Sequence, residues 1–169
     1  LHWHMCFDIG PDKYEDPSTF ESNSIHHSFS RFVTVHGTHN AQVRHNTGYI
    51  TRGHGYFIED GNEKGTILDG NLGMVAHQGI VLPTDKGTPL CQNATEGFEG
   101  SFDSSNDGCK AFSMFWVPNI NTHLDNNFAV GGRICYWILP HNTWFGYETK
   151  DRVNFENNFN FQNSKIITM

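Results

Sequence analysis

The sequence has few basic side chains and no long apolar run. Lysine and arginine number 11 against 18 aspartates and glutamates, a formal net charge of −7 with histidine neutral. This balance argues against a nucleic acid as partner, because binding to phosphates depends on many lysine and arginine contacts. No stretch approaches the roughly 20 apolar residues that span a bilayer. The longest run, 134–139, is expected to be a buried strand.

Long stretches rich in alanine, leucine, glutamate and lysine are also missing, whereas glycine (17), phenylalanine (14) and asparagine are plentiful. These residue types favour short strands joined by tight turns. The sequence starts at Leu1 without a signal-peptide pattern. We therefore expect residues 1–169 to be a segment of a longer polypeptide, truncated at both ends and prone to aggregate when expressed alone.

Cysteine is scarce, with four residues in the chain. Cys91 and Cys109 enclose a polar stretch, so a disulfide between them would restrain it. The same stretch contains a glycosylation sequon at Asn93. Either signal can arise by chance, but together they favour an extracellular or cell-surface location. Cys6 and Cys135 stand in apolar contexts and are expected to be buried thiols.

A short pattern recurs along the chain, in which an apolar residue is followed three positions later by asparagine. Its copies are 43–46, 68–71, 124–127 and 155–158, with a looser copy at 25–28. Short β-rich runs lie between these copies. Recurrence of one or two strands per unit is typical of a parallel β-helix, in which equivalent positions stack and asparagines can bond from coil to coil.

The alternative is an antiparallel sandwich, which also has short strands at regular spacing. A sandwich gives no reason for asparagine to recur at a fixed offset. The pattern therefore predicts an all-β fold, a right-handed parallel β-helix of about five coils. It forms one domain over 1–169, with a long inserted loop at about 82–110.

Several longer stretches, read in order, carry a resemblance to a known family. They are SIHHSFSRFVTVHGTHN (24–40), GHGYFIEDG (53–61), NLGMV (71–75), LPTD (82–85) and SMFWVPN (113–119). Together they resemble the β-helical ectodomain family of cell migration-inducing and hyaluronan-binding protein, transmembrane protein 2 and fibrocystin-L. The resemblance implies a right-handed parallel β-helix in a large extracellular protein, with hyaluronan or another extracellular glycan as a partner.

Two functions remain open at this point. The first is a non-catalytic β-helical segment of a cell-surface protein, serving adhesion, assembly or glycan binding. The second is part of an enzyme that depolymerises hyaluronan. Fold transfers between relatives more safely than activity, so we expect the non-catalytic function for this segment by itself.

His2 and His4 are the first candidate site. On a strand they point to the same side, because side chains alternate. Two imidazoles can hold one divalent metal such as zinc, and Asp8, His26 or His27 could supply a third ligand. Calcium prefers oxygen ligands, so a calcium ion shared between coils is instead a candidate for the carboxylates of Asp8 and Asp69. Alternatively, the two histidines are simply solvated or hydrogen-bonded.

His54 lies between Gly53 and Gly55. Flanking glycines leave an imidazole accessible, as a catalytic acid or base must be. Alternatively, both glycines serve the geometry of a turn and His54 has no chemical role.

Glu59 and Asp60 are adjacent carboxylates at an expected strand end. Neighbours on a strand face opposite sides, so the partner carboxylate for glycosidic cleavage is expected from another coil, with Asp8 or Asp69 as candidates. Alternatively, Asp60 and Gly61 form a tight turn.

Arg31, Arg44 and Arg52 are the cations of the central coils. A guanidinium can bind a uronate carboxylate through two parallel hydrogen bonds; Arg31 and Arg52 are the chosen substrate contacts. Three aromatic residues are candidates for stacking on sugar rings: Trp3, Tyr56 and Trp144.

Overall fold

The computed structural model describes residues 1–77, 112–118, 121–138, 160–162 and 165–167. These residues form strands and turns, and none of them belongs to a helix that could cross a membrane. The first coil comprises β1 (His2–Asp8), β2 (Thr19–Glu21) and β3 (Ser24–Ser28), and the second comprises β4 (Val33–His39), β5 (Gln42–Arg44) and β6 (Thr47–Arg52). The third comprises β7 (Tyr56–Ile58), β8 (Thr66–Asp69) and β9 (Leu72–His77). The last two comprise β10 (Ser113–Val117), β11 (Thr122–Asp125), β12 (Phe128–Val130), β13 (Ile134–Ile138), β14 (Asn160–Gln162) and β15 (Lys165–Ile167).

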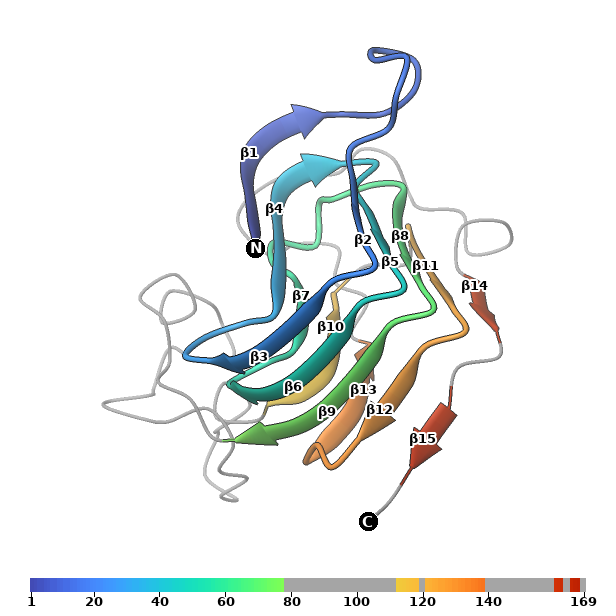
Figure 1. Cartoon of the computed structure of the whole chain (residues 1–169). Coiled ribbons are helices and arrows are strands. Elements are labelled where there is room, and N and C mark those ends of the chain that lie inside the picture. Colours follow the sequence, from blue (N-terminus) through green and yellow to red (C-terminus); the bar gives the residue numbers. More distant parts are fainter. Residues whose placement is uncertain (78–111, 119–120, 139–159, 163–164, 168–169) are drawn as a thin grey trace, which may run out of the picture.

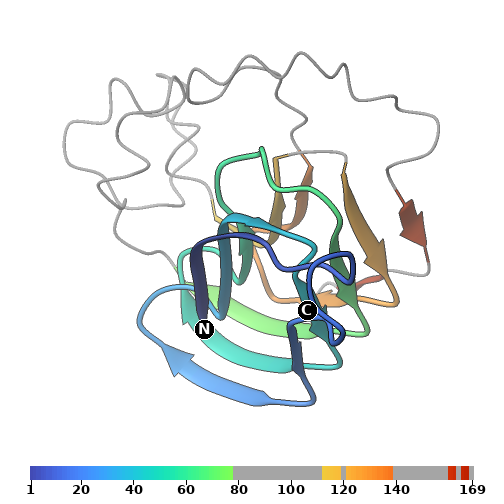
Figure 2. The same cartoon turned by 90° about the horizontal axis from the view of Figure 1, so that it is seen from above.

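The first, second and third strands of successive coils form three separate sheets, which we call A, B and C (Figure 1). Sheet A has the order β1-β4-β7-β10-β13, sheet B the order β2-β5-β8-β11-β14, and sheet C the order β3-β6-β9-β12-β15. Every neighbouring pair is parallel. Figure 2 shows the same coils from above. The predicted parallel β-helix is confirmed.

Asparagines from four coils form a hydrogen-bonded column at the corner between sheets B and C. Asn23 donates its backbone N–H and Nδ2 to Asn46 Oδ1, at 3.0 and 3.1 Å. Asn46 makes the same pair of bonds to Asn71, and Asn71 makes them to Asn127, all at 3.0 to 3.1 Å. The last three asparagines are fully buried. The predicted coil-to-coil bonding is confirmed at these positions.

The first copy of the repeat differs from the predicted one. Phe20 is in register with Val43, and Asn23 starts the column, so the first copy is 20–23. The copy expected at 25–28 is wrong, because these residues belong to β3 in sheet C. Each copy spans a strand of sheet B and its corner, so a segment of sheet C cannot replace it.

The structure also assigns the apolar position of the last copy to a different residue. The copy predicted at 155–158 lies outside the described residues, but Leu124 in β11 pairs with Phe161 in β14. Phe161 therefore occupies the position that the repeat assigned to Phe155.

The corner between sheets B and C has two residues in each of the four coils where this corner is described, and the first of the two has positive φ. These first residues are Ser22, His45, Gly70 and Asn126, with φ of 59°, 52°, 65° and 53°. At Gly70 an added Cβ would clash with Nδ1 of His45 one coil away. Glycine at this position therefore avoids both the strain of a positive φ and a clash between coils.

Aromatic rings stack through the interior behind sheet A. Tyr56 lies 4.9 Å from Phe115, and Phe115 lies 4.8 Å from Tyr136, with 10° between planes in both pairs. Tyr56 is fully buried and donates its hydroxyl to the carbonyls of Asn46 and Leu72. Burial raises the pKa of this hydroxyl. The expectation that Tyr56 contacts a sugar is wrong, because its ring belongs to the core.

The edge strand β1 changes register against β4 between His4 and Phe7. Such a bulge interrupts the alternation of sides, and Cys6 is exposed rather than buried as expected. Before the bulge, Trp3 packs against the core and donates Nε1 to Ser18 Oγ at 3.1 Å. The expectation that Trp3 is an exposed stacking residue is therefore also wrong.

Cys135 is partly buried in β13, and burial raises the pKa of its thiol. Other expectations lie outside the described residues. These are the inserted loop at 82–110, the disulfide between Cys91 and Cys109, the glycan at Asn93 and the role of Trp144.

Glu63 joins two coils from a fully buried position between β7 and β8. Its carboxylate accepts backbone N–H groups from Gly37 at 3.0 Å, Asp60 at 3.2 Å and Gly61 at 2.8 Å. Burial raises its pKa to about 7, although these hydrogen bonds favour the charged form. The Glu63 carboxyl group therefore takes up a proton when the chain folds at a pH just below 7.

We predict that Asn127→Asp destabilises the protein by roughly 2–4 kcal/mol. The change removes the Nδ2 donor to the Leu68 carbonyl and places a charge where none can be solvated. The comparison is Asn126→Asp at the adjacent exposed position, which loses only an exposed contact with Asp69 at 3.3 Å and should cost no more than about 1 kcal/mol. Equal unfolding free energies for both variants in denaturant titrations would contradict this role of the column.

We predict that Glu63 makes unfolding pH-dependent. Its pKa rises from 4.5 in the unfolded chain to about 7 in the folded one, so its contribution is fully present below pH 4.5 and is lost as the pH rises through 7. A shift of this size corresponds to roughly 3 kcal/mol. The difference in unfolding free energy between wild type and Glu63→Gln should change by this order between pH 4.5 and 8. A constant difference would refute the assignment.

Candidate functional site

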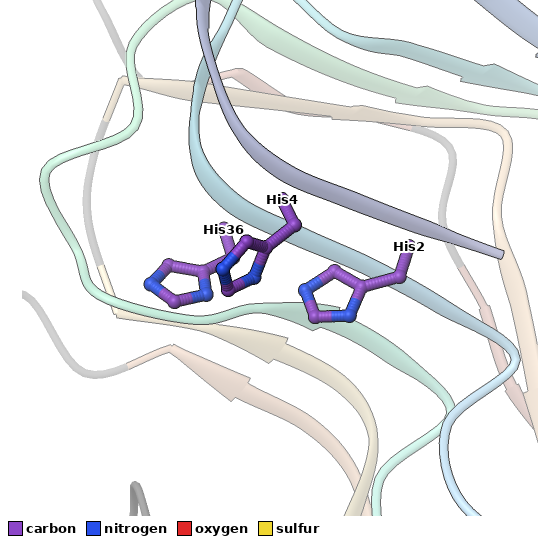
Figure 3. Close-up of side chains that lie close together, drawn as sticks. All are labelled: His2, His4 and His36. Carbon is purple, nitrogen blue, oxygen red and sulfur yellow. The ribbon is translucent and has the colours of Figure 1, made fainter.

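Three histidines meet on the outer side of sheet A. His2 and His4 lie two positions apart on β1, and His36 on β4 is in register with His4. Figure 3 shows the three imidazole rings on the same side of the β1 and β4 ribbons. One ring nitrogen from each residue lies within 4.8 Å of the others. The predicted common face of His2 and His4 thus has a third imidazole, which the sequence interpretation did not include.

The rings are packed against one another rather than dispersed in solvent. His4 makes edge-to-face contacts with His2 and His36, with centroids 5.1 and 4.6 Å apart. His2 and His36 are nearly parallel, at 5.9 Å and 20°. His2 and His4 are exposed, and His36 is partly buried beneath them. The trio is open to solvent on one side.

Two carboxylates hold His36 from the third coil. Asp60 Oδ2 lies 3.0 Å from His36 Nε2, and Glu59 Oε2 lies 3.5 Å from His36 Nδ1. Glu59 Oε2 also lies 3.9 Å from His2 Nε2. The expectation that Glu59 and Asp60 face opposite sides is wrong. Strand β7 ends at Ile58, so both acids lie in the following turn, where strand alternation does not apply.

Burial and charge act together on these groups. Burial raises the pKa of Asp60, while the neighbouring His36 and His4 act in the opposite direction. Burial lowers the pKa of His2, and the adjacent His4 and His36 lower it further. Protonation of the His2 imidazole is therefore disfavoured in this cluster.

The predicted third ligands lie elsewhere. Asp8 ends β1 beyond the bulge, where it accepts the Gly10 N–H at 3.0 Å and Asn40 Nδ2 at 2.7 Å. These bonds, first that from Gly10, lower the pKa of Asp8. His26 and His27 lie on β3 in sheet C, with their Nδ1 atoms 3.1 Å apart. None of the three belongs to the group formed by His2 and His4.

Asp69, the other candidate for a partner carboxylate, lies on β8 in sheet B. It accepts a hydrogen bond from Asn126 Nδ2 at 3.3 Å. The structure thus brings Asp60 together with Glu59 and not with Asp8 or Asp69.

His54 is not accessible, contrary to expectation. His54, which precedes β7, is only 6% exposed, and its Nδ1 accepts the Ser113 N–H at 2.9 Å. Burial, followed by the charge of Arg31, places its pKa well below the usual value. Gly55 admits the neighbouring Met114, which an added Cβ would strike. The flanking glycines therefore allow close packing instead of access.

The three candidate arginines lie in different surroundings. Arg31 is 8% exposed, with its guanidinium carbon 4.3 Å from the centre of the Phe57 ring. Arg52 is exposed at the end of β6 in sheet C, and Arg44 ends β5 in sheet B. Arg31 therefore has a packing role, which contradicts its expected role as an open contact for a uronate.

Comparisons with known proteins give the family. The family model described as CEMIP beta-helix matches residues 1–167. The chain is 39% identical to the Cell surface hyaluronidase of Danio rerio over 149 residues, 86% of this chain and 11% of the relative. It is 35% identical to the Cell migration-inducing and hyaluronan-binding protein of Homo sapiens over 144 residues, 83% of this chain and 11% of the relative. Fibrocystin-L of Mus musculus is 32% identical over 132 residues, 78% of this chain and 2% of the relative.

The chain thus spans about a tenth of the length of its first two relatives, and much less of the third. The match covers nearly every residue of this chain, and the parallel β-helix agrees with the description of the family. The resemblance inferred from the sequence motifs is confirmed, and the chain belongs to the CEMIP beta-helix family.

Proposed function

We propose that this segment supplies part of a hyaluronan-depolymerising site in a cell-surface protein, at the histidine and carboxylate cluster of sheet A. One observation carries the proposal. Among the described residues, both groups of three or more histidine or acidic side chains with mutually close ligand atoms share His36 on this outer face. A cluster of this kind is the chemical equipment that cleavage of a glycosidic bond requires.

Glu59 and Asp60 are the reactive groups of the proposed site, because most glycosidases use a pair of carboxyl groups. They replace the predicted combination of Asp60 with His54, because Nδ1 of His54 already accepts the Ser113 N–H at 2.9 Å. His36 is a positioning residue, since its ring contacts both carboxylates at 3.0 and 3.5 Å. The exposed imidazoles of His2 and His4 offer hydrogen bonds to a sugar or to its carboxylate.

The names of the relatives and the shape of the surface both support hyaluronan as the substrate class. Two of them are named for hyaluronan, one as a hyaluronidase and one as hyaluronan-binding. Parallel strands about 4.8 Å apart form an elongated outer face, across which a polysaccharide can lie. The net charge of −7 opposes a polyanion, so binding depends on close local contacts.

A non-catalytic scaffold is the second candidate, and a specific observation favours it. Arg31, His54 and Tyr56, all expected to contact substrate, are buried in packing or hydrogen-bonding roles. Under this alternative, the segment serves assembly or adhesion of the large protein.

We predict that Glu59→Gln combined with Asp60→Asn in the full-length protein reduces hyaluronan depolymerisation at least 100-fold, at the low end of what a positioned acid or base contributes. Size analysis of labelled hyaluronan after incubation measures the effect. Asp69→Asn, on sheet B, is the matched control and should keep wild-type activity.

Thermal unfolding of the same variants separates the two candidates. The catalytic function requires lost activity with a melting temperature near that of wild type. Retained depolymerisation in the double variant, or lost activity only in proportion to lost folded protein, would instead support the scaffold.

A further inference from the structure

We propose that His2, His4 and His36 bind one zinc-class divalent transition metal, with Glu59 beside its open coordination position. The inference is independent of hyaluronan cleavage, because it concerns metal binding alone. It revises the predicted ligand set by replacing Asp8 with His36.

The spacing of the three imidazoles suits a single ion. Zinc is bound by histidine nitrogen at about 2.0–2.1 Å, which places the nitrogens of a tetrahedral site about 3.4 Å apart. Ring nitrogens of His2, His4 and His36 lie within 4.8 Å of one another. His2 and His4 are exposed, so small rotations of their side chains can close the remaining distance without moving the backbone.

The backbone already arranges these ligands. His2 and His4 project from one strand, and hydrogen-bonded pairing of β1 with β4 places His36 opposite His4. Figure 3 shows the rings converging from two adjacent strands. A site on neighbouring strands of a sheet is held more precisely than one on loops.

The surroundings of His36 provide a second observation that points to a cation. Asp60 contacts its Nε2 and Glu59 faces its Nδ1. A neutral imidazole has one donor and one acceptor nitrogen, so both carboxylates find a positive partner only if the ring is protonated or a cation lies on its acceptor side. With Nε2–H donated to Asp60, a metal on the Nδ1 side relieves the repulsion from Glu59.

This arrangement matches the support that metal-bound histidines receive elsewhere. A histidine ligand commonly donates its other ring N–H to a carboxylate, which fixes the ring and raises its basicity. Asp60 fulfils this role for His36. Glu59 Oε2 lies 3.5 Å from His36 Nδ1 and 3.9 Å from His2 Nε2, so it can serve as a fourth ligand or bind a metal-bound water.

The donor atoms select the class of metal. Imidazole suits zinc, nickel, cobalt and copper, whereas calcium and magnesium take oxygen ligands. Three nitrogens with one carboxylate therefore favour zinc over calcium, the two metals that the sequence left open. If Glu59 binds a metal-bound water instead of the ion, the three imidazoles leave a position for water or substrate, as in catalytic zinc sites.

The test is zinc titration of the full-length protein after removal of bound metal with a chelator. We expect His4→Gln and His36→Gln each to lose one high-affinity equivalent relative to wild type, or to weaken it beyond the 10- to 100-fold typical of supporting residues. Asp60→Asn should weaken it by about 10- to 100-fold. The matched control is His26→Gln with His27→Gln, a close imidazole pair without a third histidine, which should leave the stoichiometry unchanged.

Cobalt provides a spectroscopic reading of the same site. We load wild type and His4→Gln with Co²⁺ and subtract the two absorption spectra. The difference should show the visible absorption of one Co²⁺ with nitrogen ligands. Because His4 is exposed, the variant should fold, and its melting temperature without metal checks this. Identical zinc stoichiometry and affinity in wild type, His4→Gln and His36→Gln would overturn the proposal, whatever the hyaluronan assay shows. Loss of the equivalent in the His26 and His27 control would overturn it too.

Discussion

The parallel pairing of equivalent strands from coil to coil is the constraint on which the rest of this structure depends. It places Phe20, Val43, Leu68 and Leu124 in one interior column and the corner asparagines in another. An asparagine suits that column because its side chain can accept from one coil and donate to the next, which satisfies backbone groups that a buried corner would otherwise leave unpaired. The same pairing sets His36 opposite His4. The candidate site is thus a product of the register and not of a local motif.

The fold could be predicted because its signature repeats. Asn46, Asn71 and Asn127 each follow an apolar residue by three positions, and all three proved to be bonded in the column. The first copy was misplaced because Ile25 and Ser28 match the spacing only loosely, while Phe20 and Asn23 match it fully. The sequence pattern was sufficient there: requiring an asparagine three positions after an apolar residue would have identified the copy at 20–23.

The site could be predicted only where one strand contains it. His2 and His4 needed nothing beyond strand alternation, whereas His36 required the relative register of β1 and β4, which the ten-residue connection 9–18 within the first coil makes hard to read from the sequence. Glu59 and Asp60 were assigned to opposite faces because the end of β7 at Ile58 cannot be located from alternation. His54 was misread for a different reason: flanking glycines can expose a side chain or admit a neighbour, and the sequence does not distinguish the two. Here the structure shows the second case, because Met114 packs directly against Gly55.

The corner between sheets B and C has a fixed length of two residues, whereas the connections at the two edges of sheet A vary in length. In sequence, consecutive strands of sheets C and A are separated by three positions (53–55) to 35 (78–112), and consecutive strands of sheets A and B by two (40–41) to 21 (139–159). The asparagine corner keeps its length in every described coil, since an extra residue there would break the bonds to both neighbouring coils. Insertions can therefore accumulate only along the two edges of sheet A. Relatives that share the same coils can consequently acquire different surroundings for that face without any change to the framework beneath it.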